Sequence, residues 1–166
     1  MKFRIASSLT LFALTLTLAG CTGGSSPEQS IADSNQTNCH RLVNLYVRFQ
    51  TQHRWNGPKD EAEFKAYINE QEPVILSRMG VDASDVESLF VSEVDNAPFV
   101  IRYRVRGSAR GSNEAVVFEK DGSGGVYRVG FTSSKVEEIE DQARYKGLLD
   151  GSIKEPLTSA GPPGGR

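Results

Sequence analysis

The stretch Pro98–Arg106, PFVIRYRVR, decides the fold that we expect, because its hydrophobic pattern repeats every two residues. Apolar side chains stand at alternate positions, namely Phe99, Ile101, Tyr103 and Val105. The later positions between them are basic, at Arg102, Arg104 and Arg106. Successive side chains of a strand point to opposite faces, so the pattern predicts a β-strand with one buried face.

Three further strands are predicted after this stretch. Two of them are Glu114–Lys120 and Val126–Phe131, joined by the sequence DGSGG at residues 121–125. The glycines of this connection can adopt the positive φ angles that a tight hairpin requires. Residues Lys135–Glu140 predict a fourth strand. We therefore expect an antiparallel meander.

The register of the first two strands can be predicted from their side chains. Matching apolar with apolar residues and opposite charges places Tyr103 across from Phe118, Val105 across from Val116 and Arg102 across from Glu119.

The residues before the meander have helical periodicity. Over Thr37–Trp55, apolar residues recur at three- and four-residue spacing, at Cys39, Leu42, Val43, Tyr46 and Phe49. A second helix is predicted over Glu61–Glu70, with Asp60 as its N-cap, and Pro73 closes it. Each of these two helices has one apolar face, which must pack on another element.

A third, short helix is predicted to begin at Ser84, which stands three residues before Glu87 as in a capping box. A last helix, bearing Ala143, Leu148 and Leu149, follows the meander. Helices that precede strands without βαβ alternation predict an α+β fold. We expect N-terminal helices packed on a small antiparallel β-meander of three to four strands, in a single domain over residues 37–150.

The N-terminus has the features of a secretory signal peptide: a basic start, an uncharged and largely apolar stretch over residues 5–18, and small residues. Leu18–Cys21, LAGC, resembles the lipobox of bacterial lipoproteins. The resemblance implies that residues 1–20 are removed and that Cys21 is lipidated. Two or three acyl chains on the mature N-terminus anchor a protein stably to a membrane.

The residue after the lipobox cysteine is Thr22. In lipoproteins of diderm bacteria, Asp at this position favours retention in the inner membrane. The resemblance therefore implies attachment to the cell envelope, at the periplasmic face of the outer membrane if the organism is diderm. Residues 21–36 predict a lipidated N-terminus and flexible tether, and residues 151–166 a disordered tail rich in Gly and Pro.

The order of helix and meander is also similar to that of the pseudopilins of secretion systems. This similarity is one of topology, because a lipobox stands where pseudopilins carry a prepilin leader. No pilin function is inferred from it.

The net charge of the chain is −2, and without Lys2 and Arg4 the balance is 17 basic to 21 acidic residues, or −4. This balance argues against a nucleic-acid partner. The sequence has no GxSxG, phosphate-binding GxxxxGK[ST], GxGxxG or CxxC motif, so we expect no cofactor. His40 and His53 lie thirteen residues apart on one helix and point in different directions, which argues against a shared metal.

Cys39 has two interpretations. It lies on the apolar face of the first helix and is expected to be a small buried hydrophobic residue. Because lipidated Cys21 cannot pair with it, the alternative is a redox-reactive thiol or an intermolecular disulfide.

Arg102, Arg104, Arg106 and the nearby Arg110 form the main concentration of basic residues in the predicted domain. One interpretation is a binding surface for anionic lipid headgroups or an acidic envelope protein. The other is a solvated strand face that discourages edge pairing.

The acidic residues Glu137, Glu138, Glu140 and Asp141 raise the alternative of an enzyme that acts on envelope polymers. Such a run of charges is more typical of a solvated face at the start of a helix. We therefore favour a non-catalytic, lipid-anchored envelope protein with a binding or structural role.

Overall fold

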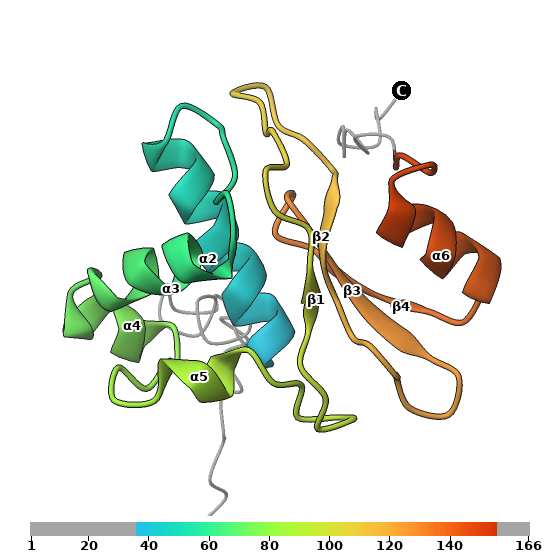
Figure 1. Ribbon diagram of the computed structural model, residues 1–166, viewed down its shortest axis with the longest axis horizontal. Helices are drawn as coiled ribbons and strands as arrows, with labels where there is room; N and C mark the ends of the chain where they lie inside the picture. Colours follow the sequence, from blue (N-terminus) through green and yellow to red (C-terminus); the bar gives the residue numbers. More distant parts are fainter. Residues whose placement is uncertain (1–35, 156–166) are drawn as a thin grey trace, which may run out of the picture.

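The computed structural model describes residues 36–155, in which a four-stranded antiparallel sheet lies between two helical layers (Figure 1). Helices α2 to α5 cover one face of the sheet and α6 covers the other, which confirms the α+β expectation. In chain order the elements are α2 (Asn38–Gln52), α3 (Glu61–Asn69), α4 (Pro73–Arg78), α5 (Val86–Leu89), β1 (Val100–Ile101), β2 (Ala115–Phe118), β3 (Tyr127–Phe131), β4 (Val136–Ile139) and α6 (Gln142–Asp150).

Helix α2 is the central helix and packs on β2 and β3. Its N-cap is Thr37, whose side-chain oxygen accepts a hydrogen bond from the backbone N–H of His40. The helix approaches the sheet closely at Gly130, where an added Cβ would lie 2.1 Å from a methyl carbon of Val43. The predicted end at Trp55 was three residues too late, because the backbone turns to positive φ after the helix.

The next helices confirm one predicted cap and correct two other predictions. Asp60 caps α3 by accepting the N–H of Glu63. Pro73 does more than close the preceding helix, since it is the first residue of α4, where its missing N–H costs nothing. Helix α5 is capped by Asp85 rather than by Ser84, whose hydroxyl and N–H instead donate to the side chain of Asp82.

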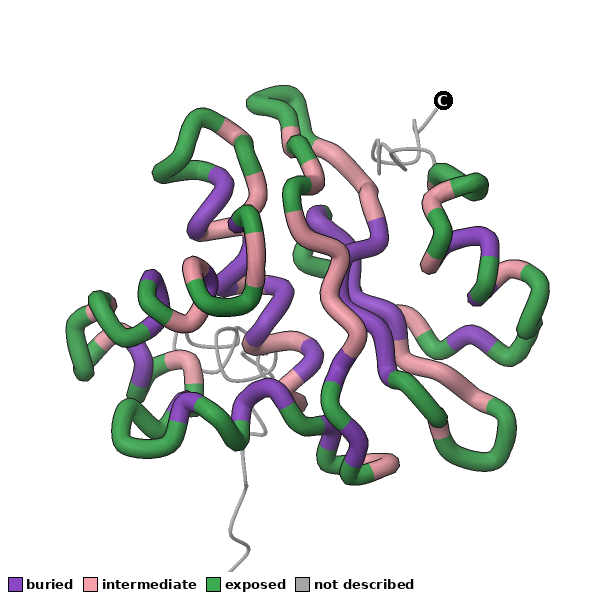
Figure 2. The backbone as a smooth tube through the Cα atoms, viewed as in Figure 1, coloured by how far each residue is buried: buried purple, intermediate pink, exposed green. Residues whose placement is uncertain are grey.

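The sheet has the simple order β1-β2-β3-β4, so the predicted meander is confirmed. Gly122, Gly124 and Gly125 all have positive φ in the connection between β2 and β3. The predicted register of the first pair was wrong by three residues, because Phe118 lies across from Val100 and not from Tyr103. Helices cover both faces of this sheet, so β2 is buried on both sides and its apolar pattern could not fix the register (Figure 2).

The shifted register also changes the environment of Glu119, which was expected to face Arg102. Glu119 is 2% exposed. Its carboxylate accepts hydrogen bonds from Ser92 Oγ at 3.0 Å and from the backbone N–H of Arg128 at 2.9 Å. A guanidinium nitrogen of Arg128 lies 3.9 Å away. Glu119 is therefore a buried structural carboxylate that joins the segment before β1 to the sheet.

Helix α6 closes a second apolar core on the far face of the sheet. This core contains Phe118, Phe131, Ile139, Tyr145 and Leu148. The Tyr145 hydroxyl also donates to the backbone oxygen of Glu119 at 2.7 Å.

The chain remains in contact with the domain beyond the predicted boundary at Asp150. Gly151 ends α6 in the left-handed conformation, and the N–H of Ile153 donates to the carbonyl of Gly147. Glu155 then pairs with Arg144 at 2.8 Å. The domain thus includes residues 151–155, which the sequence had assigned to the tail. The signal peptide, Cys21, the tether and residues 156–166 lie outside the described residues.

Candidate functional site: a basic groove

The candidate site is built on a short ribbon at the C-terminal end of α2. Residues 55–58 run antiparallel to residues 104–107 and exchange backbone hydrogen bonds of 2.7 to 3.0 Å. Asn56 lies across from Arg106. We call this pair of segments the 55–58/104–107 ribbon. The predicted strand Phe99–Arg106 therefore follows β2 only at its start and pairs with the loop after α2 at its end.

Two buried residues of α2 hold the ribbon in place. The Tyr46 hydroxyl donates to the carbonyl of Arg102 at 2.9 Å and accepts the N–H of Val105 at 3.3 Å. Gln50, which is 1% exposed, donates through Nε2 to the carbonyl of Val105 at 2.8 Å. Burial raises the pKa of Tyr46, so this hydroxyl stays protonated and able to donate.

Two residues of the ribbon, and Arg54 just before it, have a strained backbone. Arg54 and Trp55, at its entry, have φ angles of 55° and 66°, and Arg104 has a φ of 61°. Left-handed backbone is unfavourable for residues with a Cβ. At Arg104 this conformation interrupts the alternation of side chains that the sequence predicted for the strand.

A groove of about 430 Å³ lies beside the ribbon, and we call it the basic groove. It is lined by Arg102, Tyr103, Arg104, Val105, Arg106, Glu114 and Lys154. Four of these side chains are basic and one is acidic. The structure thus brings together three of the four arginines selected from the sequence.

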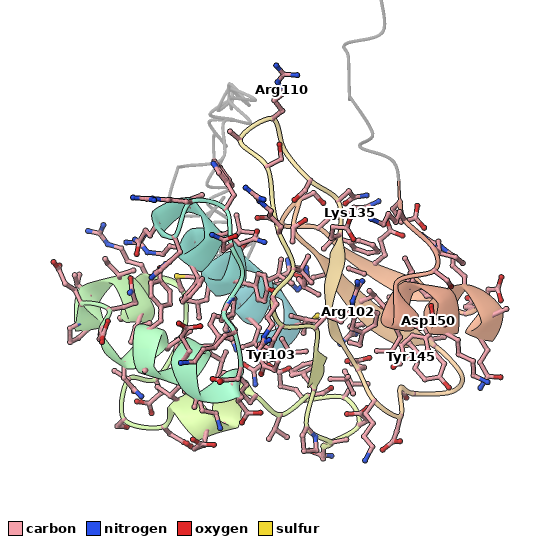
Figure 3. All side chains as sticks on the ribbon, turned by 45° about the horizontal axis from the view of Figure 1, so that its top comes forward. Arg102, Tyr103, Arg110, Lys135, Tyr145 and Asp150 are labelled. Atoms are coloured by element: carbon pink, nitrogen blue, oxygen red, sulfur yellow. The ribbon has the colours of Figure 1, made fainter. Side chains whose placement is uncertain are left out.

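Arg102 has a structural task in the groove. Its guanidinium donates to the carbonyls of Ala115 and Leu148, both at 3.1 Å. Leu148 belongs to the last turn of α6, where the carbonyls carry partial negative charge. Figure 3 shows Arg102 on the α6 side of the strand and Tyr103 on the opposite side. The predicted alternation is correct at these two positions, but the Arg102 face is covered by α6 and is not fully solvated.

Arg104 and Arg106 are exposed and have more freedom. Arg104 donates through Nε to the carbonyl of Lys59 at 3.1 Å. Within residues 36–155, neither Arg104 nor Arg106 forms an ion pair with a carboxylate. Their charge is therefore available to a ligand.

Arg110 does not join the groove. It lies in the exposed loop between β1 and β2, and Figure 3 shows its side chain pointing away from the domain. Lys154 takes a place in the groove that sequence reasoning missed, because these residues were assigned to the tail. The signal that could have found it is Gly151, a typical C-terminal helix stop after which the chain turns back. The Nζ atom of Lys154 lies 3.7 Å from Oε1 of Glu114.

Three of the four acidic residues considered for catalysis make structural contacts, and the fourth, Glu140, is exposed. Glu137 pairs with Lys135 and Arg144. Burial alone would raise the pKa of Glu137, but the hydrogen bonds from these two cations outweigh it and lower the pKa. Asp141 caps α6.

Neighbouring Glu138 lies on β4 and contacts Arg128 at 3.4 Å. The role expected for these acids at a helix start thus holds for Asp141, whereas Glu137 and Glu138 belong to a strand.

The remaining reactive residues lie apart from the groove. Cys39 is 1% exposed, as predicted, and burial followed by the charge of Glu119 raises the pKa of its thiol. His40 contacts Thr37, and His53 contacts the carbonyl of Phe49 at the other end of α2. Among residues 36–155, no group of three or more His, Cys, Asp or Glu side chains could hold a metal ion.

Within the same described range, every helix is too short or too polar to cross a bilayer. Comparison of the whole chain with family models, curated proteins and solved structures finds no match.

Proposed function

We propose that this chain is a lipid-anchored protein of the cell envelope whose domain binds an anionic partner and is not catalytic. The anchor is the lipid on Cys21, and the location is the periplasmic face of the outer membrane in a diderm organism. The lipobox residues Leu18–Cys21 support the anchor. Thr22 supports the outer membrane.

One observation carries the binding role: the basic groove concentrates four cationic side chains against one carboxylate. Arg104 and Arg106 are exposed and have no ion pair within the described residues. Two exposed arginines that the fold does not neutralise can form charge-assisted hydrogen bonds with carboxylate or phosphate oxygens.

The groove is tested with the double variant Arg104→Gln/Arg106→Gln in the full chain, purified in detergent. The probes are phosphatidylglycerol vesicles and a fluorescent oligoglutamate peptide, each at low and high salt. We expect the native chain to bind at least one probe, and the variant to bind it about tenfold more weakly, which is about 1.4 kcal/mol. The native affinity should fall as salt rises.

The matched control is Lys120→Gln/Lys146→Gln, which removes two exposed charges outside the groove. The control should bind like the native chain. Equal binding by native and groove variant, or no binding to either probe, would remove the proposed role of the groove. The anchor is tested by Cys21→Ser, which should release the protein from membranes after a salt wash.

A further inference from the structure

We infer that the natural occupant of the basic groove is an extended acidic segment of a partner protein, which crosses the ribbon and also fills a second hollow. This inference rests on the proposed function of the groove. It adds the class of partner and a second set of contacts.

The second hollow lies on the α2 side of the ribbon, and we call it the His53 hollow. It has a volume of about 480 Å³ and is lined by His53, Arg54, Asn56 and Lys59, among others. The His53 ring stacks on Phe49 with 3.9 Å between centroids, so it offers a flat surface supported from behind. Arg54 and Lys59 are exposed.

The charges of this hollow resemble those of the groove. Neither Arg54 nor Lys59 forms an ion pair within residues 36–155. The acid in the hollow, Glu63, accepts the backbone N–H of Lys59 at 2.5 Å. The His53 hollow therefore also presents cations that the fold leaves unpaired.

The two hollows are adjacent because each is lined by one segment of the ribbon. Asn56 lines the His53 hollow, and Arg106, which lies across from it, lines the groove. Paired strands are about 5 Å apart, so a ligand needs to cross only this width to reach both hollows. A peptide of eight extended residues spans roughly 26 Å, which is long enough to place carboxylates on both sides.

The shape of this surface favours a peptide over a membrane. The basic groove and the His53 hollow have volumes of about 430 and 480 Å³. Two concave sites on either side of a ribbon suit an extended chain that enters both of them better than a flat layer of headgroups.

The test measures binding of a fluorescent eight-residue glutamate peptide to the full chain in detergent, with an eight-residue glutamine peptide as the ligand control. The variant pairs are Arg54→Gln/Lys59→Gln in the His53 hollow and Arg104→Gln/Arg106→Gln in the groove. Lys120→Gln/Lys146→Gln is again the matched control. We expect each of the first two pairs to weaken binding about tenfold, or about 1.4 kcal/mol. Circular dichroism checks that all variants keep the native fold.

The outcomes separate the two proposals. If only the groove pair weakens peptide binding, the groove function stands and the crossing segment is wrong. If the peptide does not bind but phosphatidylglycerol vesicles do, the partner is a membrane surface and the inference is overturned. If neither probe binds, both proposals fail.

Discussion

Arginines at the two ends of α2 differ in whether they form ion pairs. At the N-terminal end, Arg41 pairs with Glu93 and Arg128 lies between Glu119 and Glu138. At the C-terminal end, the exposed arginines of the ribbon have no acidic partner within residues 36–155. The difference indicates that charges at the first end stabilise the fold, whereas charges at the second end are available for binding. Substitutions at the two ends should therefore affect different measurements.

The largest effect is expected from Glu119→Ala at the first end. The substitution leaves the Ser92 hydroxyl and the N–H of Arg128 without their acceptor and removes the counter-charge of Arg128. Leaving a buried hydrogen-bond donor without its acceptor costs about 1 to 3 kcal/mol for each donor. Urea denaturation of the full chain should show a loss of this size. Glu119→Gln keeps one acceptor oxygen and should lose less, and equal losses would mean that this retained acceptor oxygen contributes nothing.

A smaller effect is expected from Arg102→Gln. This variant tests whether the groove contains both arginines that stabilise the fold and arginines that are free to bind. Arg102 donates to carbonyls of β2 and α6, and hydrogen bonds from a charged group contribute about 1.5 to 3 kcal/mol. Arg106→Gln removes the same charge from the same groove without breaking such contacts, and it should change the free energy of unfolding by less than about 0.5 kcal/mol. Similar stability of both variants would contradict the structural task assigned to Arg102.

The smallest effect concerns pH at the first end of the helix. Burial, followed by the charge of Arg128, lowers the pKa of His40 below its usual value near 6.5. The unfolded chain then binds a proton more readily than the folded chain, so the free energy of unfolding should fall as pH decreases through this value. Urea denaturation at pH 7.5 and 5.5 measures the change. His40→Asn should reduce it, whereas His53→Asn leaves the His40 interactions intact and serves as the control.

The sequence predicted the elements better than it predicted their partners. Apolar alternation correctly assigned Ile101, Tyr103 and Val105 to the α2 side of the strand. It could not show that the segment would leave β2 and pair with residues 55–58. That pairing depends on hydrogen bonds from the side chains of Tyr46 and Gln50, in a helix far away in the sequence, to the backbone of the segment. Long-range contacts of this kind have no local periodic signal.

The lack of a local signal for long-range contacts also explains which residues of the candidate site could be predicted from the sequence. The arginines could be found because they occupy every second position of the predicted strand, at Arg102, Arg104 and Arg106. The cations contributed by other segments, Arg54, Lys59 and Lys154, are isolated in the sequence and become neighbours only through the ribbon and the turn after α6.

The position of α6 constrains how this domain can form during synthesis. Phe118 and Phe131 lie on a sheet face that α6 alone among the described helices covers, and α6 is the last of these helices in the chain. Whether the chain emerges from a ribosome or from a translocation pore, its first 141 residues display an uncovered apolar sheet surface. Such an intermediate is prone to aggregate until the remaining residues arrive. The second apolar core is therefore complete only once α6 has been synthesised.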